Sequence, residues 1–394
     1  TPCPDDPTAS TYEEHAMTDR SAAQPPHAAP WRIRLQAVLW FVLAGAFVLG
    51  LPVLLGWGYW APVALIVAAA LLALPSAWLV RRLSAAAGGR SFAAGWTRAT
   101  VGWTFLLGAA LSLPVYYLAT VTNTRPATIA QAALTNGSKH VIFQGMQHIA
   151  SENFYKAVIY DVEKALSEGY VVYYEGVQTG SPESKAFFGK FADELTGGGK
   201  DLDATYKSIG ELCGMQFQLD YFGLLDADKA EHPERHVIAD VDALEMKAEY
   251  ERLLREDPAF AKEHAGDFKG GPASADTAFM QGAVQWLKNG GEAQKALGGI
   301  ACRGLWSMLL QTSGEKAPGR MDAVVLDFRN RALARRVAQD PHDKIFITYG
   351  TAHLPGLLAE LRRIDPRWTV GSVKWLRTIE APQHLEGQLK GIEK

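Results

Sequence analysis

Three long apolar stretches in the first third of this chain constrain its fold more than any other feature. They cover Leu35–Gly56, Trp60–Val80 and Val101–Thr120, and none of them contains a charged residue. About twenty consecutive apolar residues are needed to cross the hydrocarbon core of a bilayer, and aromatic residues at the ends of such stretches are typical of membrane interfaces. The sequence therefore predicts a three-helix transmembrane anchor over residues 35–120, with the lipid bilayer as a partner.

The arginines predict the orientation of this anchor. Arg32 and Arg34 precede the first stretch, four more arginines lie between the second and third stretches, and the loop 57–59 has no positive charge. Short loops rich in Lys and Arg remain on the cytoplasmic side. Three crossings then place everything after residue 120 outside the cytoplasm. We expect a multi-pass protein of the inner or plasma membrane with an extracytoplasmic C-terminal domain.

The remainder of the chain divides into two tails and one sizeable domain. Residues 1–34, rich in Ala, Pro and polar residues with Met17 as an alternative start, are expected to be disordered, and residues 380–394 to form a loose tail. Residues 121–379 form the domain, in which Cys213 and Cys302 could pair in an oxidising compartment. The net charge of −3 and the lack of a basic stripe argue against nucleic acid as a partner. The oligomeric state is not indicated.

Within the domain, one pattern occurs twice: an apolar run, then Gly-x-x-His, then a helix-like segment. The first copy runs from Val141-Ile-Phe-Gln144 into Gly145-Met-Gln-His148, and the second from Ile345-Phe-Ile-Thr-Tyr349 into Gly350-Thr-Ala-His353. A buried strand that stops at a glycine delivers the next side chains to the rim of a sheet, where active sites are built. Two histidines delivered in this way could converge on one metal ion or one catalytic centre.

The context of the two copies matters more than the pattern. About one Gly-x-x-His is expected by chance, and His140 also ends such a sequence but precedes its strand. His148 and His353, in contrast, are each followed by a helical segment and a further strand-like run, 170–174 and 373–378 respectively. The first of these runs ends in Glu175. We expect it to lie parallel beside 141–144, with Glu175 at the same sheet edge as His148.

These observations predict an α/β domain made of two related strand-GxxH-helix-strand halves. The region between them, residues 178–320, is interpreted as a helical cap over the sheet edge that controls substrate access. Its best helical segments are Ala204–Phe222, Val241–Arg255, Asp276–Lys288 and Glu292–Gln311.

The motif set resembles the TraB/GumN/Tiki family, which is related more distantly to erythromycin-esterase and ChaN-type proteins. The resemblance spans about residues 138–378 and rests on Gly145-Met-Gln-His148 with Glu175-Gly176, Phe328-Arg329-Asn330-Arg331, and Gly350-Thr-Ala-His353-Leu-Pro-Gly356. It implies a metal-dependent hydrolase acting on peptide or protein substrates, with manganese or cobalt as the favoured divalent ion and zinc as a further candidate. The first motif departs from the family, which more often has Gly-Thr-x-His.

The residue types agree with that implication. A catalytic metal needs two or three protein ligands and an open position for water, and His nitrogen and carboxylate oxygen are the usual donors. His148, His353 and Glu175 are therefore the candidate ligands, with general base as the alternative role for Glu175. Asp327 follows the strand-like run 323–326 and is a further candidate ligand or orienting residue.

Arg329 and Asn330 complete the candidate site. Arg329 would stabilise a developing oxyanion or hold a carboxylate, because its planar fork suits both. Asn330 would fix an imidazole tautomer or donate to the oxyanion. Asp240 matches a position common in the family, although an N-cap for the following helix explains it equally well.

The sequence thus predicts a membrane-anchored metal-dependent hydrolase, in particular a peptidase. Two alternatives stay open. One is a non-catalytic extracytoplasmic binding or signalling domain that retains the motifs for metal or ligand capture. The other is a metal-independent, esterase-like enzyme in which His148 acts as the base.

Overall fold

The structure is a computed structural model that describes residues 31–52, 60–83, 91–196, 202–264, 285, 289–313 and 319–380. The expected disordered tail at 1–30 and most of the expected loose tail, 381–394, lie outside these residues. The chain divides into two compact units, residues 1–48 and 49–394.

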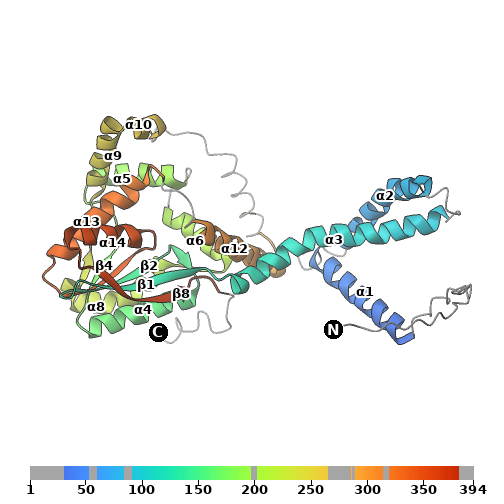
Figure 1. The fold of residues 1–394 in the computed structure, drawn as a ribbon, viewed down its shortest axis with the longest axis horizontal. Helices are drawn as coiled ribbons and strands as arrows, with labels where there is room; N and C mark the ends of the chain where they lie inside the picture. The colour runs from blue at the N-terminus through green and yellow to red at the C-terminus, as the bar shows by residue number, and fades with distance from the viewer. Residues whose placement is uncertain are drawn as a thin grey trace, which may run out of the picture. The chain divides into compact units, whose positions relative to one another are not determined.

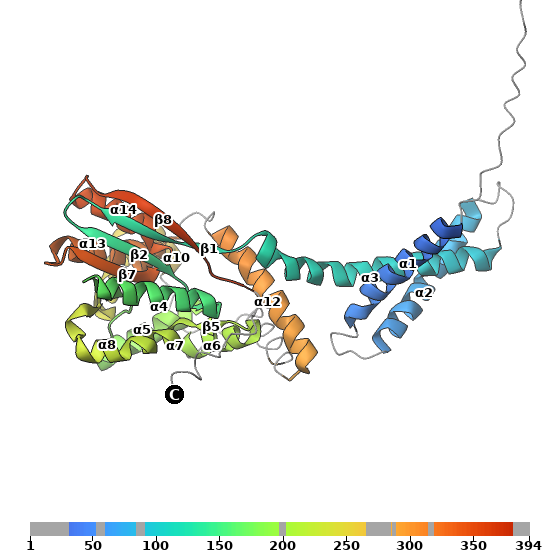
Figure 2. The same cartoon turned by 90° about the horizontal axis from the view of Figure 1, so that it is seen from below.

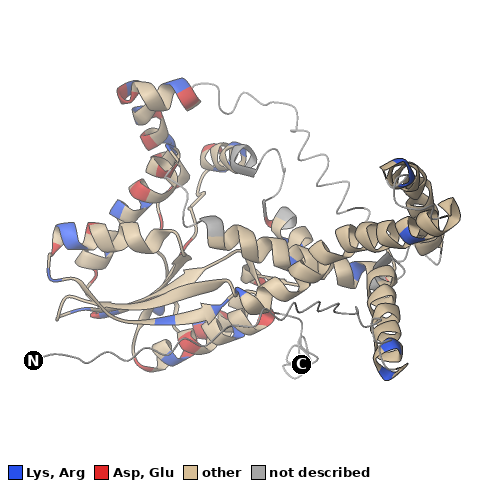
Figure 3. Cartoon of the chain, turned by 45° about the vertical axis from the view of Figure 1, so that its right-hand side comes forward, with Lys and Arg blue, Asp and Glu red and all other residues tan. Residues whose placement is uncertain are grey.

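Three helices cover the predicted membrane spans, except that residues 53–56 of the first span lie outside the described residues (Figure 1). They are α1 (Trp31–Pro52), α2 (Trp60–Leu83) and α3 (Phe92–Thr124), and all three are long and apolar enough to cross a membrane. Their only charged residues are arginines, which lie towards the helix ends (Figure 3). Because α1 begins at Trp31, residues 31–34 are helical and do not belong to a disordered tail.

Helices α2 and α3 pack through small residues. Ala69 and Ala73 are fully buried on α2, and Ser112 is fully buried on α3. The Trp103 indole donates a hydrogen bond to Ser76 Oγ at 3.0 Å across the same interface. Large apolar side chains point outward instead, such as Leu71 with 61% of its surface exposed. Close contact through small residues with an apolar exterior is typical of helices packed in lipid.

The domain is built on a six-stranded sheet with the order β6-β4-β7-β2-β1-β8 (Figures 1 and 2). The strands are β1 (Thr128–Thr135), β2 (His140–Met146), β4 (Val171–Tyr174), β6 (His236–Ile238), β7 (Lys344–Gly350) and β8 (Thr369–Arg377). Strand β1 pairs antiparallel with both β2 and β8, whereas β2, β4, β6 and β7 pair parallel with one another. The carboxyl ends of these four strands therefore share one edge of the sheet.

Helices cover both faces of the central strands, as Figure 2 shows, whereas the edge strand β8 is largely exposed. On strand β7 the alternate residues Ile345 and Ile347 pack with helices α13 (Arg329–Gln339) and α14 (His353–Ile364), while Phe346 packs with α4 (Glu152–Ser167) on the other face. This alternation is the two-residue period of a strand that is buried on both sides.

The first predicted half folds as α4 between β2 and β4. Phe154, Val158 and Val162 of α4 are buried at the helical spacing, and Gly169 ends the helix with a φ of 86°. Ser151 occupies the N-cap position, but its hydroxyl makes no capping hydrogen bond.

The order of the strands differs from the prediction. Strand β4 does not lie beside β2, because β7 is inserted between them and pairs with both. The two Gly-x-x-His strands are thus direct neighbours, with Gly145 opposite Tyr349 and Met146 opposite Gly350.

The helical connection from β2 leads to β4 on one side of β7, whereas the connection from β7 leads to β8 at the far edge of the sheet. Connections that leave in opposite directions place their helices on opposite faces when both are right-handed.

The region between the halves is largely helical. Its helices are α5 (Pro182–Thr196), α6 (Leu202–Cys213), α7 (Gln218–Phe222), α8 (Asp226–Glu231), α9 (Ala243–Glu256), α10 (Pro258–His264) and α12 (Glu292–Ser313). The predicted helix Ala204–Phe222 is interrupted, because Gly214 has a φ of 62° and β5 (Gln216–Phe217) then pairs with β3 (Ile149–Ala150). The predicted helix Asp276–Lys288 lies outside the described residues, apart from residue 285.

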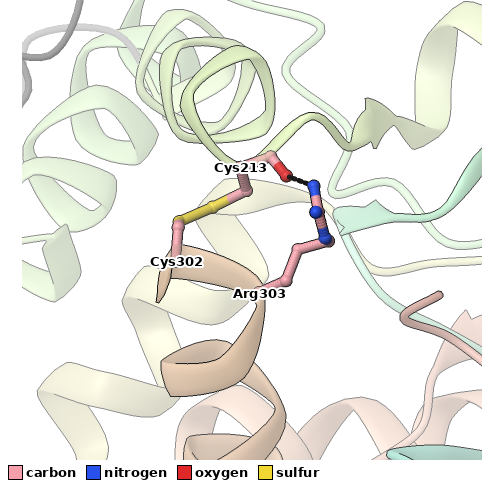
Figure 4. The surroundings of a disulfide bond; sticks show 3 residues. All are labelled: Cys213, Cys302 and Arg303. Atoms are coloured by element: carbon pink, nitrogen blue, oxygen red, sulfur yellow. Dashed lines mark hydrogen bonds between the residues drawn. A yellow bond between two sulfur atoms is a disulfide. The ribbon is translucent and has the colours of Figure 1, made fainter. Parts of the chain in front are cut away.

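Two connections tie α12 to the rest of the second unit. A disulfide joins Cys302 to Cys213 at the end of α6, and Arg303 Nη1 donates to the Cys213 carbonyl at 2.7 Å (Figure 4). At its other side, α12 packs on α3, where a Cβ on Gly304 would lie 2.4 Å from the Leu118 carbonyl oxygen. The absence of a side chain at Gly304 therefore permits the close approach of the two helices.

Residues 323–326 do not form the predicted strand. They belong to a short helical segment, η4 (Ala323–Phe328), which leads directly into α13. Val324 is buried in a cluster with residues of α5, α9 and α10, and Val325 and Phe328 pack against it. This packing overrides the strand preference of a β-branched run, which is itself only a weak determinant.

Candidate functional site

The candidate site lies at the carboxyl edge of the parallel strands, where open α/β sheets bind their ligands. Glu175 follows β4, Asp240 follows β6, and Gly350 is the last residue of β7. The amino-terminal ends of α13 and α14 bring Arg329, Asn330 and His353 to the same place, because both helices pack on this side of the sheet.

Glu175 is at the centre of a hydrogen-bonded group. Its Oε1 accepts from Arg329 Nη2 at 2.7 Å, and its Oε2 accepts from the Gly350 backbone N–H at 2.5 Å. His353 Nε2 lies 3.6 Å from the same Oε1. Burial opposes ionisation of Glu175, but His353, Arg329 and the Gly350 N–H outweigh it and hold the pKa of this carboxyl well below its usual range. Glu175 is therefore an anion at neutral pH.

Arg329 binds two carboxylates at once. Its Nε and Nη2 donate to Asp240 Oδ1 and Oδ2 at 3.0 and 2.5 Å, while the second Nη2 hydrogen goes to Glu175. One Nη1 hydrogen reaches the Val325 carbonyl at 3.4 Å. The side chain is only 7% exposed; burial opposes its charge, but Asp240 and Glu175 raise its pKa overall. Four of the five guanidinium hydrogens are thus engaged, so Arg329 holds carboxylates and has little capacity left for a substrate.

His353 has one fixed nitrogen and one available nitrogen. Its Nδ1 lies 2.8 Å from Asn330 Oδ1, and an amide oxygen can only accept, so Nδ1 carries the proton. When the ring is also protonated at Nε2, this N–H faces Glu175 and lowers the pKa of the carboxyl; in the neutral ring the Nε2 lone pair takes its place. The imidazole is 3% exposed and packs edge-on against Tyr349, whose hydroxyl donates to the Ala239 carbonyl at 2.5 Å.

Two glycines of the motifs are required by close packing around this group. A Cβ on Gly356 would lie 2.2 Å from Asn330 Nδ2, so any side chain there displaces Asn330. A Cβ on Gly145 would lie 2.5 Å from Ile129 Cγ2 and 3.0 Å from Thr351 Oγ1. These contacts give a physical reason for the glycine in each motif.

His148 lies at the same edge but outside this group. It is solvent-exposed, its ring stacks on Tyr206 with a centroid separation of 4.3 Å, and its carbonyl accepts from Gln218 N–H. It makes no hydrogen bond or ion pair with Glu175 or His353. Partial removal of the imidazole from water lowers its pKa, although the nearby Glu175 charge works in the opposite direction. The imidazole is therefore neutral at pH 7.

Asp327 is not brought to the site. It lies on the exposed side of η4 and, within the described part of the chain, makes no hydrogen bond or ion pair. The helical conformation of 323–328 explains this outcome, because Asp327 was expected at the end of a strand.

The described residues fit a divalent ion only in part. His353 Nε2 and Glu175 Oε1 are close enough to share one ion, and a metal-binding histidine usually donates its other N–H as His353 does to Asn330. Against this, Arg329 places a positive charge on the same carboxylate oxygen. No group of three or more His, Cys, Asp or Glu side chains in the described residues is arranged to hold a metal.

Asp240 and Tyr349 are the residues that sequence reasoning undervalued. Asp240 is not the N-cap of α9, because Asp242 takes that position and forms a capping box with Glu245. Instead, its carboxylate is 1% exposed and binds Arg329 and the Gly176 N–H. The role of Asp240 could have been predicted from its position in the sequence, because it directly follows an apolar run, as Glu175 follows β4.

Comparisons with known proteins identify no relative: no family model, no curated protein and no solved structure matches this chain. The resemblance to the TraB/GumN/Tiki family therefore rests on the motif residues alone, and the roles of those residues depend on their geometry.

Proposed function

We propose that this chain is a membrane-anchored hydrolase that cleaves a peptide bond with a water molecule activated between His353 and Glu175. The observation that carries the proposal is the fixed tautomer of His353. Asn330 holds the Nδ1 proton, so Nε2 is the atom that gains or loses a proton, and it lies 3.6 Å from a Glu175 carboxylate oxygen. A polar atom that contacts both groups would be oriented and polarised, which is what general-base catalysis requires.

In the proposed reaction the water oxygen bonds to the carbonyl carbon while its proton passes to His353 Nε2. The imidazolium that forms lies beside the Glu175 anion, which stabilises it. The carbon–nitrogen bond then breaks, and the same proton passes from Nε2 to the leaving amine. The low pKa of Glu175 makes it a weak base, so its role is to stabilise charge and to orient the water.

A divalent ion bound between His353 and Glu175 would lower the pKa of a bound water and would polarise the substrate carbonyl. His353 and Glu175 would hold it, with His148 as the candidate third ligand. Manganese or cobalt is favoured by the family resemblance, with zinc as a further candidate. Arg329 and Asp240 are positioning residues in either case, because Arg329 donates to Glu175 and Asp240 holds the Arg329 guanidinium in place.

The domain is proposed to work outside the cytoplasm. The arginine distribution around the three apolar helices supports this side of the membrane. The Cys213–Cys302 disulfide supports it as well, since such bonds persist mainly in oxidising compartments. An alkaline-phosphatase fusion at residue 130 should be active. An inactive fusion, with an active cytosolic reporter at the same point, would reverse the orientation.

The enzyme is tested with the full chain purified in detergent. Internally quenched peptide libraries are incubated with added manganese, cobalt or zinc, and in parallel with excess chelator. We expect cleavage by the parent and its loss in Glu175→Gln, while Asp327→Asn keeps activity because that side chain lies outside the site. Metal content is measured in the same samples. Cleavage that survives in Glu175→Gln would contradict the proposal.

A metal-independent, esterase-like enzyme is the second candidate. It is favoured by the neutral, solvent-exposed His148, which could accept a proton from water without a metal. Full activity in excess chelator, together with loss of activity in His148→Gln but not in His353→Gln, would favour this candidate over the first.

A further inference from the structure

A cavity of about 440 Å³ opens beside Glu175 and is not used by the reaction described above. Its floor comes from the ends of the parallel strands, and its wall comes from α7 and β6. The lining includes Met146, Tyr174, Thr348, Leu219, Phe222 and Ile238. The volume lies in the lower half of the range of about 300–1,000 Å³ that is usual for ligand pockets.

The mouth of the cavity carries two large apolar side chains that remain in contact with water. Leu219 is 49% exposed and Ile238 is 54% exposed, although both line the cavity. Exposed apolar side chains gathered around a concavity mark a binding site for an apolar group, since covering them removes that surface from water. Glu175 borders the same cavity, so a group bound there lies next to the proposed reaction centre.

One wall of the cavity is held rigid by a chain of three polar side chains. Asp228 Oδ2 lies 2.6 Å from His236 Nε2, and His236 Nδ1 lies 2.8 Å from the Tyr174 hydroxyl. The carboxylate accepts from Nε2–H, so Nδ1 is free to accept from the phenol. Phe222 packs edge-on against the Tyr174 ring at 5.4 Å. The aromatic wall is therefore formed before any ligand binds, which lowers the entropy lost on binding.

The charges that border the cavity are already paired. Lys229 contacts Asp226 at 3.3 Å and Glu175 contacts Arg329, while both ring nitrogens of His236 are used in hydrogen bonds to Asp228 and Tyr174. An ionised group in the cavity would lose its hydration without gaining an unpaired partner among these residues. A neutral, apolar group has no such hydration to lose. The paired charges and the apolar mouth therefore both favour an apolar ligand.

We propose that this cavity is the specificity pocket of the hydrolase and takes an aromatic or large aliphatic side chain next to the scissile bond. The proposal rests on the proposed function for the position of that bond. The pocket selects substrates by size and apolarity, and the Tyr174–His236–Asp228 chain keeps its wall in place.

The test measures kcat/KM of the full chain on peptides that differ only in one residue, Phe or Ala, beside the cleaved bond. A pocket of this kind should favour Phe by about tenfold to a hundredfold. Ile238→Trp, which fills the mouth, should reduce the Phe-to-Ala ratio to near one. Ile364→Trp is the matched control at an exposed position on α14, and it should keep the parent ratio. A parent ratio near one, or the parent ratio retained in Ile238→Trp, would overturn the pocket.

A binding measurement separates failure of the pocket from failure of the enzyme. Ligand-observed NMR with N-acetylphenylalaninamide and N-acetylalaninamide is carried out on Glu175→Gln, in which turnover is expected to be about 10²–10⁴-fold slower. Selective binding of the Phe compound that is lost in Glu175→Gln/Ile238→Trp supports the pocket even if no peptide is ever cleaved. Equal binding of the two compounds overturns the pocket, even if the parent proves to be a peptidase.

Discussion

The two Gly-x-x-His motifs end neighbouring strands, with their glycines offset by one residue, and their histidines have different environments. His353 is 3% exposed and donates its Nδ1 proton to Asn330, whereas His148 is exposed and is held by stacking on Tyr206. The two imidazoles differ because only one of them has a hydrogen-bonding helix beside it. Helix α13 supplies an acceptor to His353, and in the described part of the chain nothing comparable reaches the His148 ring. The same four-residue pattern therefore produces two chemically different imidazoles.

The largest expected effect comes from removing each imidazole in turn. His353→Gln should lower kcat/KM by about 10²–10⁴-fold, because it removes the proposed general base. His148→Gln should lower it less, by about tenfold to a hundredfold, as expected for a supporting residue. Peptide cleavage by the purified full chain measures both. Equal losses in the two variants would show that the histidines share one role, and would contradict His353 as the base with His148 in support.

A large loss of stability is expected when the centre of the ion-pair group is removed. Arg329→Met leaves Glu175 and the 1%-exposed Asp240 without their counter-ion. Removing one partner of a buried pair costs about 3–5 kcal/mol. Thermal unfolding of the full chain in detergent measures the effect. Arg367→Met, which breaks an exposed pair with Asp365, is the control and should change little. Similar melting temperatures for the two variants would contradict the account of Arg329.

A smaller effect should follow from a single methyl group at Gly356. Gly356→Ala displaces Asn330, whose Nδ2 lies 2.2 Å from the new Cβ position, and so releases the Nδ1 proton of His353. We expect kcat/KM to fall by about tenfold to a hundredfold, as for other residues that orient a catalytic histidine. Gly371→Ala is the matched control, because its Cβ meets nothing closer than 3.7 Å. Unchanged activity in Gly356→Ala would mean that the tautomer is fixed in another way.

The smallest effect concerns the protonation of His148. Its pKa is lowered by loss of water contact, so the unfolded chain binds this proton more tightly than the folded chain. The contribution to stability is complete above the ordinary histidine pKa near 6.5 and is lost as the pH falls through the folded pKa. Histidine NMR should find the His148 pKa below 6.5 and moved upward in Tyr206→Ala. A value above 6.5 in the parent would contradict the predicted environment.

The sequence allowed the local elements to be predicted, but not their order in the sheet. Uninterrupted apolar runs identified β2 and β7, and helical spacing of apolar residues identified α4 and α14. The insertion of β7 between β2 and β4 depends on long-range pairing, which no local pattern contains. The run 323–326 was assigned to a strand because of its valines, and packing against the cap made it helical.

The sequence also predicted some residues of the candidate site correctly and others not. Glu175, His353, Arg329 and Asn330 were named from the sequence and lie together: Arg329 donates to Glu175, His353 bonds to Asn330, and His353 Nε2 lies 3.6 Å from Glu175 Oε1. Asp240 was explained equally well as an N-cap, because an aspartate beside a helix start has both uses, and only the position of Arg329 distinguishes them. The prediction that Asp327 belongs to the site depended on a strand over residues 323–326, and the structure has a helical segment there.

The most direct test of the Glu175–His353 centre is the rate of peptide cleavage by Glu175→Gln beside Asp327→Asn, in the same membrane-derived preparation and with the same added ions. Glutamine keeps the size of Glu175 and one hydrogen-bond acceptor but removes the charge that stabilises the imidazolium. We expect Glu175→Gln to lose activity by about 10²–10⁴-fold while Asp327→Asn remains at the parent rate. Parent-like activity in Glu175→Gln, or an equal loss in Asp327→Asn, would contradict it.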